Sequence, residues 1–247
     1  MNIDPGFINT ARWPVFYEDN HLLVVYKPSG LLIQGDCTGD VCLLELARQY
    51  VKIRYEKPGN VFLALVHRLD RPVAGVVVFA RTSKAASRLG RQFRTGRVEK
   101  QYLAVVHGVV SGRGGDLVNN MERKGPTSRI VSAPTAKSRE ARLSCRVLGT
   151  AEKKTLLEID LDTGRHHQIR AQLAHLGFPV MGDLRYGAPN PLPQKQLALF
   201  AYKLSFDHPT GQHRLSFTAP LPADWPWPGM NTDANAVAWD WKAVVQK

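Results

Sequence analysis

Apolar residues alternate with polar ones in several short stretches of the chain, a pattern typical of antiparallel strands. The predicted strands are residues 21–26, 76–80, 101–107, 142–148, 155–161, 197–206 and 214–218. Apolar positions at three- and four-residue steps predict helices at 41–50, 83–94 and 164–176. The polar and basic stretch 120–141 is interpreted as a long hairpin or an exposed flap. Many strands with few helices favour an α+β fold on an extended, mostly antiparallel sheet flanked by helices.

The predicted helix 83–94 has two distinct faces. Ala85, Leu89 and Phe93 recur at four-residue steps and are expected to pack on the core, with Ser83 as N-cap. Residues 81–100 hold seven basic residues and one acid. An ordinary solvated face would carry charges of both signs, so this excess favours contact with phosphates. The basic residues of the helix expected to make that contact are Lys84, Arg88, Arg91 and Arg94.

The whole chain also carries an excess of positive charge. It has 33 Lys and Arg residues against 21 Asp and Glu, a formal net charge of +12 and a pI near 9.8. This charge favours a polyanionic partner, which could be RNA, DNA or an acidic membrane. A membrane is disfavoured because no apolar segment approaches the roughly 18 residues needed to span one, and because no basic-then-apolar leader precedes the domain.

Three cysteines, Cys37, Cys42 and Cys145, form an odd and sparse set. Such a set fits a reducing compartment rather than a disulfide framework, so a cytoplasmic location is expected. Cys37 and Cys42 lack a second Cys or His pair at zinc spacing, and no metal site is predicted.

The stretch from His67 to Pro72 places one carboxylate, Asp70, between Arg68 and Arg71, just before an apolar run. Nearby guanidinium groups favour the ionised form of a carboxylate. Such an anion can act as a nucleophile, or it can simply tether a surface loop. The residues of this stretch alone favour the tether.

Three patches, taken in order, change that balance: His67-Arg68-Leu69-Asp70, Lys100-Gln101-Tyr102-Leu103-Ala104-Val105 and Gly164-Arg165-His166-His167-Gln168-Ile169-Arg170. Together they closely resemble the RluA-type RNA pseudouridine synthases. Supporting matches are Lys27-Pro28-Ser29-Gly30, Gly182-Asp183 with Tyr186-Gly187, and His208-Pro209. The resemblance implies a pseudouridine synthase fold with a central active-site cleft.

The resemblance covers about residues 15–225, which are expected to form the catalytic domain. Residues 1–14 are expected to be an irregular lead-in, too short for the S4 RNA-binding domain that many relatives carry. Residues 226–247, rich in Trp and Pro, are expected to dock on the body. A monomer is expected.

The resemblance implies isomerisation of a specific uridine in structured RNA, either rRNA or tRNA, without a metal or nucleotide cofactor. Asp70 would be the nucleophile or the proton-abstracting base, and Arg170 would pair with it. Tyr102 would pack its ring on the uracil. The target base would leave its stack, at a cost of a few kcal/mol.

RNA contacts are implied for three further residues. Arg68 would occupy the space that the flipped base leaves, and Arg165 and His167 would contact phosphate or the flipped nucleotide. Hydrogen bonding at a helix start remains the alternative for Arg165 and His167.

The chain departs from the family pattern at a few positions. Val73-Ala74 replaces the usual Thr-Ser after the aspartate motif, Tyr26 replaces an Asn and Phe200 a His. Because the first change removes two hydroxyls beside the aspartate motif, one alternative remains: the chain could be a basic RNA-binding module without catalytic activity. A glycosidase-like enzyme that releases the base is disfavoured, since such enzymes generally need two carboxylates and the motif has one.

Overall fold

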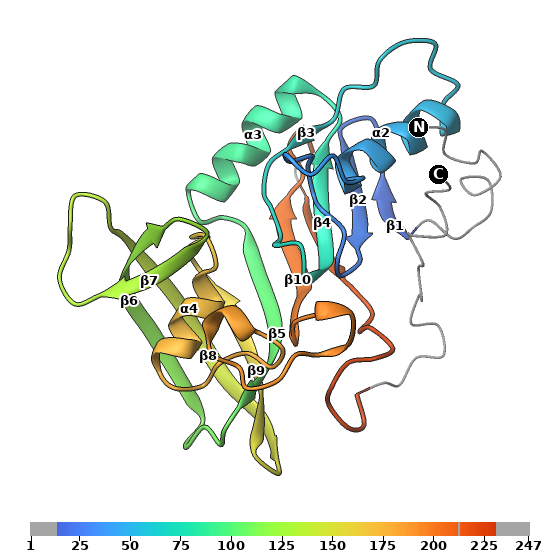
Figure 1. Cartoon of the computed structure of the whole chain (residues 1–247). Helices are drawn as coiled ribbons and strands as arrows, with labels where there is room; N and C mark the ends of the chain where they lie inside the picture. Colours follow the sequence, from blue (N-terminus) through green and yellow to red (C-terminus); the bar gives the residue numbers. More distant parts are fainter. Residues whose placement is uncertain (1–13, 212, 231–247) are drawn as a thin grey trace.

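The computed structural model describes residues 14–211 and 213–230, and these residues form one large sheet with a few helices (Figure 1). The strands are β1 (Val15–Glu18), β2 (Leu22–Lys27), β3 (Ala64–Leu65), β4 (Ala74–Ala80), β5 (Glu99–His107), β6 (Gly114–Lys124), β7 (Thr127–Val131), β8 (Arg139–Ala151), β9 (Lys154–Leu161), β10 (Leu199–Asp207) and β11 (Arg214–Thr218). The helices are α2 (Leu43–Arg54), α3 (Ser83–Arg94) and α4 (Gln168–His175), with short 3-10 turns η1 (Leu184–Tyr186) and η2 (Pro193–Lys195).

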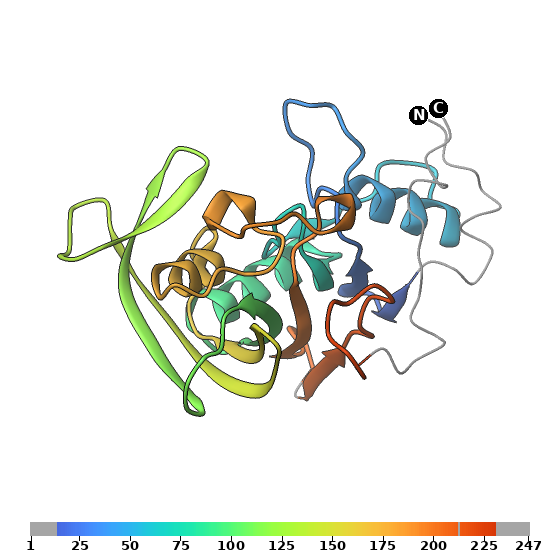
Figure 2. The same ribbon diagram turned by 60° about the horizontal axis from the view of Figure 1, so that its bottom comes forward.

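The strand order along the sheet is β1-β2-β4-β10-β5-β9-β8-β6-β7, with β3 beside β4 and β11 beside β10. The β4–β10 pair is parallel, and the other pairs in the described part of the chain are antiparallel. The predicted α+β fold on an extended, mostly antiparallel sheet is confirmed. The stretch 120–141 does include a hairpin, formed by β6 and β7, which projects from the body in Figure 2.

The sheet divides into two halves that meet where β10 pairs with β5. In Figure 1, α2 lies beside β1 and β2 in one half, α4 lies against the β6–β9 strands of the other, and α3 lies above the junction. The three patches singled out in the sequence begin or end at this junction. The fold therefore brings them to one place although about 100 residues separate Asp70 from Arg170.

The apolar runs become the central strands because both of their faces are covered. All seven residues of β4 are buried, as are the six of β2 beside it. Ala85 and Leu89 of α3 are fully buried as predicted, and Phe93 is partly buried against the core.

Two sequence predictions about helix starts need correction. The N-cap of α3 is Thr82, whose hydroxyl accepts the Ala85 N–H at 3.2 Å, and not Ser83. The helix expected from Gly164 begins only at Gln168, because His167 adopts a left-handed conformation with φ 54°.

Trp225, the last residue of the predicted catalytic domain, packs on the body: it is 5% exposed, with its ring 5.9 Å from that of Phe200. Trp239 and Trp241 lie outside the described residues. The domain limits and the docking of residues 226–247 stay predictions. Among the described helices, none is long and apolar enough to cross a bilayer.

Gly75, near the start of β4, allows this strand to lie close to β10. Its φ is +136°, and a Cβ added there would lie 2.2 Å from the Ala201 carbonyl oxygen on the parallel strand β10. Any side chain would therefore push β4 away from β10 and also force an unfavourable backbone conformation.

We predict that Gly75→Ala lowers the free energy of unfolding by more than about 2 kcal/mol, measured by urea denaturation. Gly115→Ala on β6 is the matched control, because nothing lies within 4 Å of a Cβ there, and its effect should stay below about 0.5 kcal/mol. Equal unfolding free energies for the two variants would contradict the close β4–β10 contact.

Candidate active site

A cleft of about 1220 Å³ opens at the junction of the two halves. All three sequence patches contribute to its wall, so the structure brings them together as the sequence predicts. The lining side chains that matter below are His67, Arg68, Asp70, Phe93, Arg94, Lys100, Tyr102, Arg123, Arg165, His166, His167 and Arg170.

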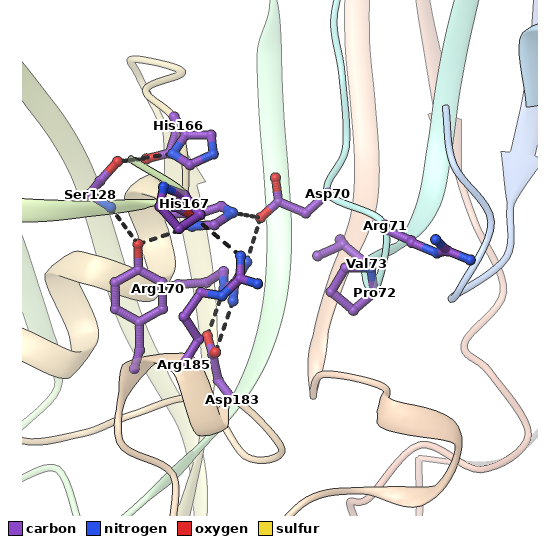
Figure 3. A network of polar contacts seen from close by, with 12 residues as sticks. Asp70, Arg71, Pro72, Val73, Ser128, His166, His167, Arg170, Asp183 and Arg185 are labelled. Carbon is purple, nitrogen blue, oxygen red and sulfur yellow. Dashed lines mark hydrogen bonds and ion pairs between the residues drawn. The ribbon is translucent and has the colours of Figure 1, made fainter. Parts of the chain in front are cut away.

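Asp70 lies in this cleft and is paired with an arginine from a distant helix. Arg170 Nη1 of α4 donates to Asp70 Oδ2 at 2.9 Å (Figure 3). The two arginines next to Asp70 in the sequence do not form this pair. Arg71 turns away to Asp40, with Nη2 2.8 Å from Oδ2, and to the Gly30 carbonyl oxygen. Arg68 is exposed in the cleft.

The other edge of the Arg170 guanidinium is held by a second carboxylate. Arg170 Nε and Nη2 donate to the two oxygens of Asp183 at 2.6 and 2.8 Å, and Asp183 is 1% exposed. Burial alone lowers the pKa of Arg170, but the hydrogen bonds and charges of Asp183 and Asp70 raise it above its ordinary value. Arg170 is therefore a fixed cation, aimed by one acid at the other. Sequence reasoning cited Gly182-Asp183 only as a supporting match and missed this role.

His167 lies against the same carboxylate. Its Nε2 is 3.5 Å from Asp70 Oδ2, and its Nδ1 is 3.0 Å from the hydroxyl of Tyr186. Burial lowers the pKa of His167 to about 4, although the charge of Asp70 opposes this. The ring is thus neutral near pH 7 and mostly shielded from solvent. The contact with RNA predicted for His167 stays a prediction.

Tyr186, Ser128 and His166 extend this polar network, and sequence reasoning did not assign them. The Ser128 N–H donates to the Tyr186 hydroxyl at 2.8 Å, and Ser128 Oγ contacts His166 Nδ1 at 3.1 Å. Ser128 lies on β7, so the network ties the β6–β7 hairpin to Asp70 (Figure 3). In the sequence, Tyr186-Gly187 and His166 of the third patch matched the family, but nothing pointed to Ser128.

Tyr102 and His67 supply ring surfaces to the cleft. Burial and the charge of Asp70 raise the pKa of Tyr102 above its ordinary value, so its hydroxyl stays neutral. The ring of His67 stacks on Phe93 of α3, with centroids 4.8 Å apart and planes at 15°. Burial lowers the pKa of His67 to about 3, and its Nε2 accepts the Val78 N–H at 3.0 Å.

A buried lysine holds the loop that carries Asp70. Lys27 is fully buried, and its Nζ donates to the carbonyl oxygens of Pro28, Arg71 and Val73 at 2.8 to 3.0 Å. Burial lowers the pKa of Lys27 to about 7, and Asp70 opposes this shift. The side chains of Val73 and Ala74 are buried. Donors from the turn at 27–30 thus support the backbone where the family usually has Thr-Ser.

The candidate RNA-binding residues separate into two groups. Arg68, Arg94 and Arg165 are exposed and line the cleft. Lys84, Arg88 and Arg91 are exposed on α3 but do not line it, and Arg88 Nη1 donates to the Pro209 carbonyl oxygen. Arg123 of the β6–β7 hairpin, which sequence reasoning did not single out, also lines the cleft. Within the described residues no group of His, Cys, Asp and Glu side chains could hold a metal ion.

Known proteins match this chain in sequence and in fold. The RNA pseudouridylate synthase family profile matches residues 21–175. The chain belongs to this family. The match covers β2 through α4 and so contains Asp70, Tyr102 and Arg170, all three of the residues assigned to chemistry.

Relatives within the family extend the match. The chain is 35% identical over 227 residues to ribosomal large subunit pseudouridine synthase D of Xylella fastidiosa, a match that covers 85% of this chain and 66% of the relative. It is 31% identical over 218 residues to synthase C of Buchnera aphidicola, covering 84% and 66%. The chain therefore spans about two thirds of the length of these relatives.

Among solved structures, the human RNA pseudouridylate synthase domain containing 4 has the same fold. It aligns with a TM-score of 0.74 and 22% identity over 90% of this chain and 93% of the human chain. At this identity the likeness concerns the fold alone.

We predict that Lys27→Met lowers the free energy of unfolding by about 3 kcal/mol, because the buried carbonyl oxygens of Pro28 and Val73 lose their donor. Thermal and urea denaturation measure the loss. Lys52→Met on the exposed face of α2 is the control, and it should change stability by less than about 0.5 kcal/mol. If Lys27→Met were as stable as this control, Lys27 would not hold the Asp70 loop.

Proposed function

We propose that this chain isomerises uridine to pseudouridine in structured RNA and that Asp70 starts the reaction. The observation that carries the proposal is the Asp70–Arg170 pair inside a cleft lined by further arginines. A fixed guanidinium orients the carboxylate and compensates its charge, which suits a group that reacts as an anion. Family membership supports the same activity.

The reaction breaks the C1′–N1 bond, turns the uracil and forms a C1′–C5 bond, with the C5 hydrogen lost to solvent and a proton gained at N1. Attack of Asp70 on C1′, attack on C6 and removal of the C2′ proton all begin with the anionic carboxylate. Tyr102 supplies a neutral ring on which the detached base can stay in place.

The substrate we propose is ribosomal RNA. The relatives from Xylella fastidiosa and Buchnera aphidicola carry ribosomal large subunit in their names, and the net charge of +12 suits a polyanion. The target base must leave its stack to reach Asp70, whose side chain is 30% exposed in the cleft. Arg68 lies in the cleft where it can fill the vacated position.

A monomer in the cytoplasm completes the proposal. The three cysteines Cys37, Cys42 and Cys145 are free, as in a reducing compartment, and ribosomal RNA is found there. The body at residues 15–225 would carry both substrate binding and chemistry.

The two alternatives are less well supported. A non-catalytic RNA-binding module would not need a buried Arg170 aimed at a carboxylate. A glycosidase-like reaction needs a second carboxylate facing the sugar. Asp183 is near, but both of its oxygens are bound to Arg170 and it is buried.

We predict that Asp70→Asn abolishes pseudouridine formation in ribosomal RNA while the RNA Kd changes less than about threefold. Tritium release from RNA labelled at uridine C5 measures turnover, and filter binding measures affinity. Asp116→Asn on the exposed face of β6 is the control and should turn over like the unmodified chain. Substantial turnover by Asp70→Asn would rule out its role.

The salt dependence of RNA binding distinguishes the two groups of basic residues. Neutralising Arg94 and Arg123 together should reduce the slope of log Kd against log salt by about 1.5, since each phosphate contact contributes roughly 0.7 to 0.9. Neutralising Lys84 and Arg91, which do not line the cleft, should change the slope by less than half as much. A larger change in slope for Lys84 and Arg91 than for Arg94 and Arg123 would place the RNA on the part of α3 that does not line the cleft.

A further inference from the structure

The hydroxyl of Tyr186 lies between two groups that fix the direction of its hydrogen bonds. The Ser128 N–H donates to Tyr186 Oη at 2.8 Å, and an amide N–H can only donate. The other hydrogen-bond contact of this oxygen within residues 14–211 and 213–230 is His167 Nδ1 at 3.0 Å, a ring nitrogen that accepts or donates according to the tautomer. No other group in this part of the chain is placed to accept the Tyr186 proton. The single hydroxyl proton of Tyr186 is therefore directed to Nδ1, which must present a lone pair.

The opposite nitrogen of the same ring agrees with this assignment. His167 Nε2 faces Asp70 Oδ2 at 3.5 Å, where an N–H is attracted and a lone pair is repelled. Burial lowers the pKa of His167 to about 4, and the charge of Asp70 opposes this while Arg170, His166 and Arg185 reinforce it. The neutral ring carries one proton, and both ends of the ring place it on Nε2.

One hydrogen-bond donor, Arg170 Nη1, and one longer contact, His167 Nε2, thus approach the same oxygen of the Asp70 carboxylate. Arg170 Nη1 makes the shorter contact with Asp70 Oδ2, at 2.9 Å, and the His167 N–H adds a directed dipole to the same atom. Within the described part of the chain no donor contacts Oδ1. The two carboxylate oxygens are therefore not equivalent.

We propose that Tyr186 is a positioning residue for the reaction: by fixing the His167 tautomer, it directs a second N–H to Asp70 Oδ2 and leaves Oδ1 to meet the extruded nucleotide. The inference rests on the proposed function, since it assigns the reacting atom of that chemistry. Oδ1 is the oxygen that forms the new bond, whether to carbon or to the C2′ proton.

The tautomer can be measured without RNA or turnover. Two-bond 1H–15N correlation spectra of the full 15N-labelled chain should show His167 as the neutral form protonated at Nε2. Tyr186→Phe should convert it into a mixture of tautomers. An Nδ1-protonated ring in the unmodified chain would overturn the inference, whatever the protein does to RNA.

A double-mutant cycle tests the effect on chemistry. Tyr186→Phe should lower the single-turnover rate of pseudouridine formation about tenfold, the size of one lost hydrogen bond, with RNA Kd changed less than twofold. His167→Gln places an amide N–H near the position of Nε2, and an amide has no tautomer to be fixed. Adding Tyr186→Phe to His167→Gln should therefore cause no further loss.

Each outcome decides the point. If Tyr186→Phe lowered the single-turnover rate equally in the unmodified chain and in the His167→Gln variant, Tyr186 would act only through Ser128 and the β6–β7 hairpin. The inference would then be wrong. No loss from Tyr186→Phe alone would also overturn it. The control is Tyr17→Phe, which removes a hydroxyl hydrogen bond to Asp19 outside the cleft. If the unmodified chain forms no pseudouridine, the proposed function fails, and the tautomer measurement still decides the role of Tyr186 in the ring orientation.

Discussion

The guanidinium of Arg170 joins the two halves of the molecule at the point where chemistry is proposed. It is buried, and it donates two N–H groups to Asp183 in its own half and a third to Asp70 in the other half. A buried arginine with one carboxylate would satisfy only part of its fork. With Asp183 holding one edge, the Nη1 N–H that reaches Asp70 has a fixed direction, so the position of Asp70 is set by α4 and η1 as much as by its own loop. Lysine, with one flexible point charge, could not serve both acids in this planar geometry.

The loop of Asp70 is fixed from the other side by its backbone. Lys27 donates to the carbonyl oxygens of Arg71 and Val73, and Gly75 lets β4 lie directly against Ala201 of β10. Neither contact depends on side-chain hydroxyls in the loop itself. The loop is therefore supported with Val73-Ala74 in place of the Thr-Ser that the family resemblance implied. Backbone carbonyls are present whatever the side chain is, so the support survives the substitution.

The sequence predicted the fold well because its signals are local. Helix α3 begins and ends where the spacing of Ala85 and Leu89 placed it, and the buried run of β4 was visible as a continuous apolar stretch. In the site, only the residues of the three motif patches, such as Asp70, Tyr102 and Arg170, could be predicted from the sequence. Asp183 and Ser128 gave little signal, because their partners lie 13 and 38 residues away and only the folded chain pairs them. The helix expected from Gly164 begins four residues later since His167 is held left-handed, which periodicity cannot reveal.

Two other departures from the family pattern, Tyr26 and Phe200, lie next to each other in the core and are explained together. Tyr26 and Phe200 stand where an Asn and a His are usual, and in the fold their rings are 6.3 Å apart, with Trp225 packed on Phe200. The two positions thus form an aromatic contact between strands β2 and β10 of the sheet, which buries apolar surface. Neither ring lines the cleft. Both side chains therefore belong to the core under β2, β4 and β10 and do not contact the Asp70, Arg170 and His167 cluster of the cleft.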